Sequence, residues 1–186
     1  MEEGFDQEQS RLIRISITGP ESSGKTELTK SLALHFNTSF ACEYAREYLE
    51  INGPSYTVDE LDIICEGQIR NEENALSKAE RLVFFDTDML VLKIWSEFRF
   101  GKSSDYIASQ YESRSYDLSL LCYPDLEWED DPLRESRGKE ERDHLFELYK
   151  DSLEEKNAPY VIIRGHGELR LELAIEAIEN FLQSLN

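Results

Sequence analysis

Cysteine, histidine and positive charge are scarce in this sequence. Among 186 residues there are three cysteines and three histidines, and 20 Lys and Arg stand against 39 Asp and Glu. The cysteines (Cys42, Cys65 and Cys122) are widely spaced and odd in number, which favours reduced thiols in a cytoplasmic protein over a disulfide framework. The histidines have none of the spacings typical of zinc sites and therefore predict no such site.

The formal net charge of −19 argues against binding to nucleic acid or to an anionic membrane, since both need a positive face. No apolar run is long enough to span a bilayer. Residues 1–10 are acidic, unlike a signal peptide, and we expect them to form a short flexible tail. The remaining residues, 11–186, have the length of one globular domain with a full core.

The strongest motif spans residues 19–26 and fits the phosphate-binding pattern G-x-x-x-x-G-K-[ST]. A strand is expected over residues 12–18 and a helix over 27–36, which is the context that this motif requires. Lys25 would then reach the β- and γ-phosphates of ATP, and the Thr26 hydroxyl would bind Mg²⁺. The expected ATP contacts in this loop are Gly19, Glu21, Ser22, Ser23, Gly24, Lys25 and Thr26.

A second motif is the apolar run of residues 82–85, which ends in Asp86. The run predicts a strand buried on both faces, and an acid at its end is typical of Walker B. Asp86 is therefore expected to hold Mg²⁺ near Thr26. Asp88 has two compatible interpretations: it shares that role or orients the acceptor, and it caps the helix expected over residues 89–98.

Polar and aromatic residues follow the short strand expected at residues 40–42. Glu43, Tyr44 and Arg46 would lie past the carboxyl end of that strand, where ligands bind in open α/β sheets. The alternative is an ordinary helix start, in which Glu complements the helix dipole. Gln68, in a helix expected over residues 58–79, would face a substrate or hydrogen-bond to a neighbouring loop.

A highly charged segment, residues 125–142, follows the strand expected at 117–122. It is either a solvated loop or a lid, expected around residues 126–142, that brings Arg134 and Arg137 onto the γ-phosphate and excludes water. Trp128 would stack on a flat ring in that case. Further helices are expected over 106–113, 140–153 and 168–185, with a strand over 160–163. Arg170, near the turn after that strand, is the candidate contact for adenine.

Together, these motifs resemble the ribosylnicotinamide kinase family, in particular the kinase domain of NadR-type NAD biosynthesis proteins. The matching pieces are residues 19–26, 43–47, 85–88 and 128–134, with Gln68 in its helix, in the order found in the family. The segments Glu-Tyr-x-Arg-Glu and Trp-x-Asp-Asp-x-Leu-Arg are the most specific of them. Within these 186 residues we expect no counterpart of the family's nucleotidyltransferase domain, and Cys42 stands where some members carry an aromatic residue.

The resemblance implies a three-layer P-loop kinase fold, α/β, with a five-stranded parallel sheet flanked by helices. It implies transfer of the γ-phosphate of ATP, with Mg²⁺, to the 5′-hydroxyl of nicotinamide riboside. The catalytic residues that we expect are Lys25, Asp86, Asp88, Arg134 and Arg137. The substrate-binding residues that we expect are Glu43, Tyr44, Arg46, Gln68, Trp128 and Asp130. The alternatives are a kinase for another nucleoside and a regulatory ATPase or nucleotide switch that acts on a protein partner.

Overall fold

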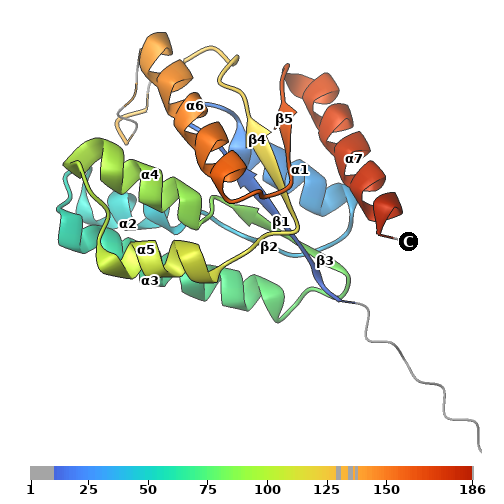
Figure 1. Cartoon of the computed structure of the whole chain (residues 1–186), viewed down its shortest axis with the longest axis horizontal. Helices are drawn as coiled ribbons and strands as arrows, with labels where there is room; N and C mark the ends of the chain where they lie inside the picture. Colours follow the sequence, from blue (N-terminus) through green and yellow to red (C-terminus); the bar gives the residue numbers. More distant parts are fainter. Residues whose placement is uncertain (1–10, 129–130, 134–135, 137, 186) are drawn as a thin grey trace, which may run out of the picture.

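The computed structural model of the chain describes residues 11–128, 131–133, 136 and 138–185, so the expected tail lies outside the described residues. Within these ranges the strands are β1 (Ile13–Thr18), β2 (Phe40–Ala41), β3 (Leu82–Asp86), β4 (Leu118–Cys122) and β5 (Tyr160–Ile163). The helices are α1 (Lys25–His35), α2 (Tyr44–Asn52), α3 (Val58–Leu76), α4 (Met89–Phe100), α5 (Asp105–Ser113), α6 (Lys139–Glu155) and α7 (Gly167–Ser184) (Figure 1). None of the helices in these ranges combines the length and apolar character that a membrane crossing requires.

The five strands form one parallel sheet in the order β2-β3-β1-β4-β5. β1 lies in the middle, directly between β3 and β4. In the register of β1 and β3, Ile17 lies opposite Asp86. The loop that follows β1 therefore leaves the sheet beside the carboxylate that ends β3.

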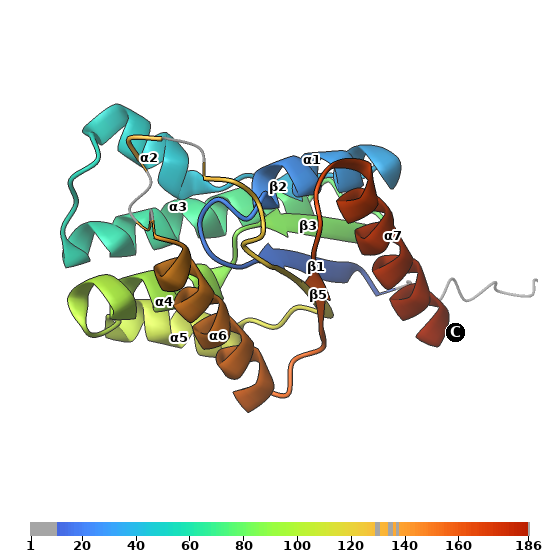
Figure 2. The same cartoon turned by 90° about the horizontal axis from the view of Figure 1, so that it is seen from above.

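Helices cover both faces of the sheet (Figures 1 and 2). On one face, α1 and α7 pack against alternate strand residues, among which Ile15 and Phe84 are fully buried. On the other face, a larger core joins α3 to α6 and includes Leu121 and Phe146. The expected three-layer α/β fold with a five-stranded parallel sheet is confirmed.

Polar residues in β1 have specific partners. The buried Ser16 hydroxyl donates to the Ser119 hydroxyl of β4 over 2.9 Å, so both groups are satisfied inside the sheet. The backbone N–H of Arg14, at the exposed beginning of the strand, donates to the Asp117 carboxylate over 2.7 Å. A cross-strand hydrogen bond therefore explains why this central strand is not apolar on both faces.

The start of α2 packs closely on α3 because Gly67 has no side chain. A Cβ atom at Gly67 would lie 2.0 Å from the Tyr44 ring, nearer than van der Waals contact allows. The Arg70 guanidinium lies 5.8 Å from the centroid of the same ring. Gly67 thus fixes how near α2 approaches α3.

We expect Gly67→Ala to lower the free energy of unfolding by about 1–3 kcal/mol, because overpacking outweighs the better helix propensity of alanine. Urea denaturation measures the change. In a Tyr44→Ala background the same substitution should cost much less, since the ring that it meets is absent. An equal cost in both backgrounds would contradict this packing argument.

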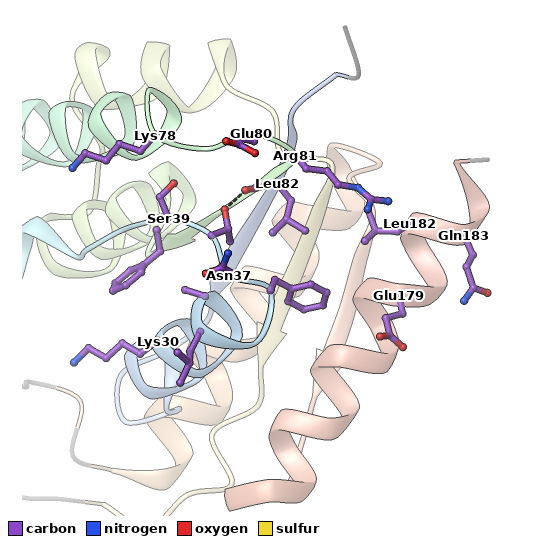
Figure 3. A pocket seen from close by; sticks show the side chains of 15 residues that line it. Lys30, Asn37, Ser39, Lys78, Glu80, Arg81, Leu82, Glu179, Leu182 and Gln183 are labelled. Atoms are coloured by element: carbon purple, nitrogen blue, oxygen red, sulfur yellow. Dashed lines mark hydrogen bonds between the residues drawn. The ribbon is translucent and has the colours of Figure 1, made fainter. Parts of the chain in front are cut away.

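A broad hollow of about 1020 Å³ lies at the amino ends of β2 and β3 (Figure 3). Lys30, Lys78 and Arg81 line it together with Glu80 and Glu179, so charges of both signs are mixed there. Neither the glycine-containing loop nor the acid of β3 reaches this hollow. The candidate functional site is therefore at the other end of the sheet, where the glycine-containing loop and Asp86 lie, although this hollow is large.

Candidate active site

The loop between β1 and α1 has the backbone of a phosphate-binding loop. Gly19 has φ 130° and Gly24 has φ 76°, a region that side chains disfavour. A Cβ atom at Gly19 would also lie 2.7 Å from the Cys122 carbonyl oxygen, so glycine is required there for space as well. α1 begins at Lys25 directly after Gly24, and its free N–H groups therefore face the loop.

Side chains of the loop itself and of α7 support this loop through hydrogen bonds to its carbonyl groups. The Lys25 ammonium donates to the Pro20 carbonyl over 2.9 Å, and the Ser23 hydroxyl donates to the same oxygen over 2.7 Å. Arg170 of α7 donates to the Ser23 carbonyl over 2.5 Å and to the Asp125 carboxylate over 2.9 Å. Arg170 is 4% exposed, so it supports the loop from the protein side rather than taking the expected position against adenine.

Asp86 lies next to Thr26, as the two motifs predicted. The Thr26 side chain hydrogen-bonds to the Asp86 carboxylate, which is almost fully buried. Burial raises the pKa of Asp86, while the Thr26 hydrogen bond and the nearby Lys25 and Lys30 charges oppose that rise. The carboxylate is therefore a costly buried charge held close to the phosphate-binding loop.

The donor set at this point fits Mg²⁺. In the described part of the chain, the buried Asp86 Oδ1 has no hydrogen-bond partner. An unpaired carboxylate oxygen beside a threonine hydroxyl matches the one or two protein ligands that Mg²⁺ takes when phosphates supply the others. Among the same residues, no group of three or more His, Cys, Asp and Glu side chains is arranged around a metal position. Thr26 and Asp86 are therefore the residues that would hold the ion.

Asp88 takes the capping role that the sequence left open. Its Oδ1 accepts from the Val91 N–H at the start of α4 over 3.1 Å and from the Thr18 hydroxyl over 3.2 Å. Burial raises the pKa of Asp88, and these hydrogen bonds oppose the rise. Asp88 does not line the cavity beside the loop. The structure thus gives it a supporting position instead of the expected contact with metal or acceptor.

Thr87, between the two acids, has φ 74°. A β-branched residue in this left-handed region is a clear outlier, and such strain costs on the order of 1–3 kcal/mol. Its N–H donates to the Ile17 carbonyl of β1 over 3.2 Å. The strained peptide turns the chain between Asp86 and Asp88, so the two carboxylates serve different partners.

A cavity of about 890 Å³ opens in front of the loop. It is lined by residues of the loop and of α1, α2, α4, α6 and the segment after β4. Ten of the expected site residues line it: Gly19, Glu21, Ser22, Ser23, Gly24, Lys25, Thr26, Glu43, Arg46 and Trp128. The structure therefore brings the phosphate-binding loop and most of the expected substrate residues into one space.

Tyr44 and Gln68 lie behind the cavity wall and not on it. Tyr44 packs its ring on Gly67, as described above. Both polar atoms of the Gln68 amide are bonded to backbone groups, Tyr44 N–H over 2.8 Å and the Thr87 carbonyl over 3.2 Å. Gln68 therefore takes the second of its two expected alternatives, a hydrogen bond to a neighbouring loop.

The described parts of the charged segment contact both sides of the cavity. The Ser136 N–H donates to the Glu21 carboxylate of the phosphate-binding loop over 2.9 Å. The Arg46 guanidinium of α2 donates to the Asp131 carboxylate over 2.6 Å, and this hydrogen bond raises the pKa of Arg46.

Asp130, Arg134 and Arg137, expected to bind substrate or the γ-phosphate, lie outside the described residues.

The apolar part of the cavity was not predicted from the sequence. It is formed mainly by α4 and α6, through Val91, Ile94, Trp95, Phe98, Leu145 and Tyr149. Aromatic residues at helical spacing, such as Trp95 in α4, are usually core residues. The sequence of α4 does contain an indication of the cavity wall. This helix is apolar around most of its circumference, which is more than packing against one layer requires.

A buried acid outside the cavity lies on α3. Glu72 of α3 is 3.5 Å from the Arg114 guanidinium and accepts from the Tyr116 hydroxyl over 3.4 Å. Burial raises the pKa of Glu72 to about 7, despite the nearby Arg114 charge. Glu72 therefore changes its charge near neutral pH.

This ionisation makes stability depend on pH. Since the pKa of Glu72 is higher in the folded state than its ordinary value of 4.5, stability falls as pH rises from about 4.5 through about 7. Relative to wild type, Glu72→Gln should gain up to about 3 kcal/mol between pH 5 and 8, because folding raises the pKa of Glu72 from 4.5 to about 7. Urea denaturation at several pH values checks this. Glu73→Gln, at the exposed neighbouring position, is the control and should show no such gain.

The fold and this loop define the class: the protein is a three-layer P-loop protein with a phosphate-binding loop beside a buried acid. Residues 14–170 match the family AAA_28, described as an AAA domain. The chain therefore belongs to that family.

Individual relatives are more specific. The chain is 28% identical over 151 residues to the trifunctional NAD biosynthesis/regulator protein NadR of Escherichia coli (strain K12), covering 79% of this chain and 37% of the relative. A NadR protein solved in complex with NR superposes with a TM-score of 0.78 at 25% identity, covering 93% of this chain and 52% of that one. A deoxyadenosine kinase from M. mycoides shares the fold alone, with a TM-score of 0.61, 12% identity, and coverage of 90% and 100%.

The resemblance to NadR-type proteins that the motifs suggested is confirmed. The chain nevertheless spans only about half or less of these two relatives' own length.

Proposed function

We propose that the protein is an ATP-dependent kinase that phosphorylates the 5′-hydroxyl of nicotinamide riboside to nicotinamide mononucleotide, a step in NAD salvage. One observation carries the proposal. The cavity that contains Lys25 and Thr26 continues into a compartment with acidic and aromatic side chains, among them Glu43, Trp95 and Trp128. Carboxylates and aromatic faces suit a cationic pyridinium ring. The solved NadR relative with bound NR supports the same substrate.

Positioning and charge neutralisation account for most of phosphoryl transfer. In this proposal the N–H groups of the loop and the Lys25 ammonium hold the β- and γ-phosphates. Thr26 and Asp86 would hold Mg²⁺, which when bound would neutralise charge that develops on the phosphate oxygens. Arg134 and Arg137 would add positive charge from the lid, and their described neighbours Leu133 and Ser136 line the cavity.

Three acids are candidates for directing the proton of the acceptor hydroxyl: Asp86, Asp88 and Glu43. The Asp88 carboxylate caps α4, and Asp86 lies against Thr26 outside the cavity lining. Glu43 is the one of these three acids that lines the cavity. These positions favour Glu43 for this role.

The proposal is tested by ADP release with and without nicotinamide riboside, followed by a panel of pyrimidine and purine ribosides. Strong stimulation by nicotinamide riboside, with formation of the mononucleotide, is expected. Stimulation by a different riboside alone would show that the proposed acceptor is wrong, while the assignment as a kinase would stand. Slow hydrolysis that no nucleoside changes would reject the kinase in favour of a regulatory ATPase.

A further inference from the structure

Gln68 connects two parts of the active site that are remote in sequence. Its side chain is 1% exposed and lies between the first turn of α2 and the peptide that follows β3. Oε1 accepts from the Tyr44 N–H, and Nε2 donates to the Thr87 carbonyl. Because one partner can only donate and the other can only accept, the orientation of the amide is fixed by its neighbours.

The first of these bonds replaces a helix cap. Tyr44 is the first residue of α2, and its N–H belongs to the groups that have no partner within the helix. The preceding Glu43 does not cap the helix with its side chain. The amide of α3 provides an acceptor instead, and the Glu43 carboxylate lines the cavity.

The second bond acts on the strained peptide. Thr87, at φ 74°, is bonded to β1 through its N–H and to Gln68 through its carbonyl. The conformation of this residue determines where the two neighbouring carboxylates point: Asp86 toward Thr26, and Asp88 into the cap of α4. A conformation that costs free energy persists only where the surroundings hold it.

We propose that Gln68 is a positioning residue that clamps the Thr87 carbonyl, keeps Asp86 beside Thr26 for Mg²⁺, and ties this geometry to α2. Gln68 thus acts through Asp86 and touches no substrate. The effect on turnover rests on the proposed kinase function, whereas the effect on metal-dependent nucleotide binding does not.

The experiment compares Gln68→Glu and Gln68→Leu with wild type. The first keeps an acceptor for Tyr44 N–H but loses the donor to Thr87, and the second loses both bonds at similar size. Asn71→Ala is the matched control, because this amide on the same helix donates to the Cys42 carbonyl before α2 and not to Thr87.

Thermal unfolding with AMP-PNP, with and without Mg²⁺, measures binding apart from catalysis. In the presence of Mg²⁺, both Gln68 variants should bind AMP-PNP about tenfold more weakly than wild type. Without Mg²⁺, both variants should bind AMP-PNP with the affinity of wild type. Their kcat should fall about tenfold or more, while KM for nicotinamide riboside changes less than about twofold. Asn71→Ala should match wild type in all of these. Unchanged Mg²⁺-dependent binding with a raised KM for the riboside would overturn the proposal and make Gln68 a substrate ligand.

Thr87→Gly provides a second test, because glycine adopts φ 74° without strain. In that background the peptide depends less on the clamp, so Gln68→Glu should reduce Mg²⁺-dependent AMP-PNP binding by a smaller factor. Equal reductions in both backgrounds would contradict a role through Thr87. If no nucleoside stimulates ADP release, the proposed function fails, and the binding comparison still decides the role of Gln68.

Discussion

Replacing Lys25 by alanine is expected to reduce phosphoryl transfer at least about a hundredfold, the loss typical when one preorganised charge-stabilising group is removed. The ammonium lies over the loop that it would serve, bonded to the Pro20 carbonyl and facing the cavity. In the transition state charge spreads over the transferring oxygens, so a fixed positive charge contributes more there than in the ground state.

The fold should tolerate this change. Lys25 is only partly buried, and the Pro20 carbonyl that loses its hydrogen bond still accepts from the Ser23 hydroxyl. Rates of ADP formation, with circular dichroism and the thermal midpoint as checks of folding, measure the outcome. Lys78→Ala removes a lysine from the hollow at the far end of the sheet and should leave turnover unaffected. Turnover of Lys25→Ala near the wild-type rate would reject the site.

Asp86→Asn is expected to make the ligand-free protein more stable while it lowers phosphoryl transfer about 10²- to 10³-fold, a loss assigned by analogy with other charge-stabilising groups. Asparagine keeps the size of the side chain and an oxygen for the Thr26 hydrogen bond. It removes a buried charge, and an unpaired neutral group costs less inside a protein than an unpaired ion. Removal of the charge also removes the ligand that attracts Mg²⁺.

The pH dependence of this gain in stability has a definite sign. Burial raises the pKa of Asp86 in the folded state, so ionisation costs stability as pH rises above the ordinary value of 3.8. The advantage of Asp86→Asn should therefore be absent near pH 3 and largest at neutral pH. Denaturant unfolding without nucleotide or Mg²⁺ measures it at both ends. A variant less stable than wild type at neutral pH would show that the carboxylate has a stabilising partner.

The parts of the site that could be predicted from the sequence are those that backbone pattern determines. The glycine loop and the apolar run before Asp86 locate the carboxyl ends of two strands, and parallel neighbours bring those ends together. The residue types at these strand ends were then enough to predict that Lys25, Thr26 and Asp86 lie close together. The five strands were predicted as well, since each is a short stretch with apolar residues on at least one face.

Side-chain direction could not be predicted in the same way. For Asp88 and Gln68 the sequence left a ligand contact and a structural role open, and for Arg170 it predicted a ligand contact; all three hydrogen-bond to backbone groups of the protein. Their sequence positions place them near the edge of the sheet but do not say which way they point. The apolar wall formed by α4 was missed for the opposite reason, because an aromatic residue in a cavity and one in the core have the same sequence pattern.

The contacts of Arg170 determine how far this chain can be shortened before it loses function. One guanidinium on the last helix holds the Ser23 carbonyl, a partner 147 positions earlier, together with the turn after β5 through the Gly165 carbonyl. A truncation that removed α7 would keep every residue of the nucleotide-binding motif. It would nevertheless remove the Arg170 guanidinium that holds the Ser23 carbonyl of that loop. The minimal folding unit therefore extends beyond the motifs by which the protein is recognised, and shortened versions should retain that helix.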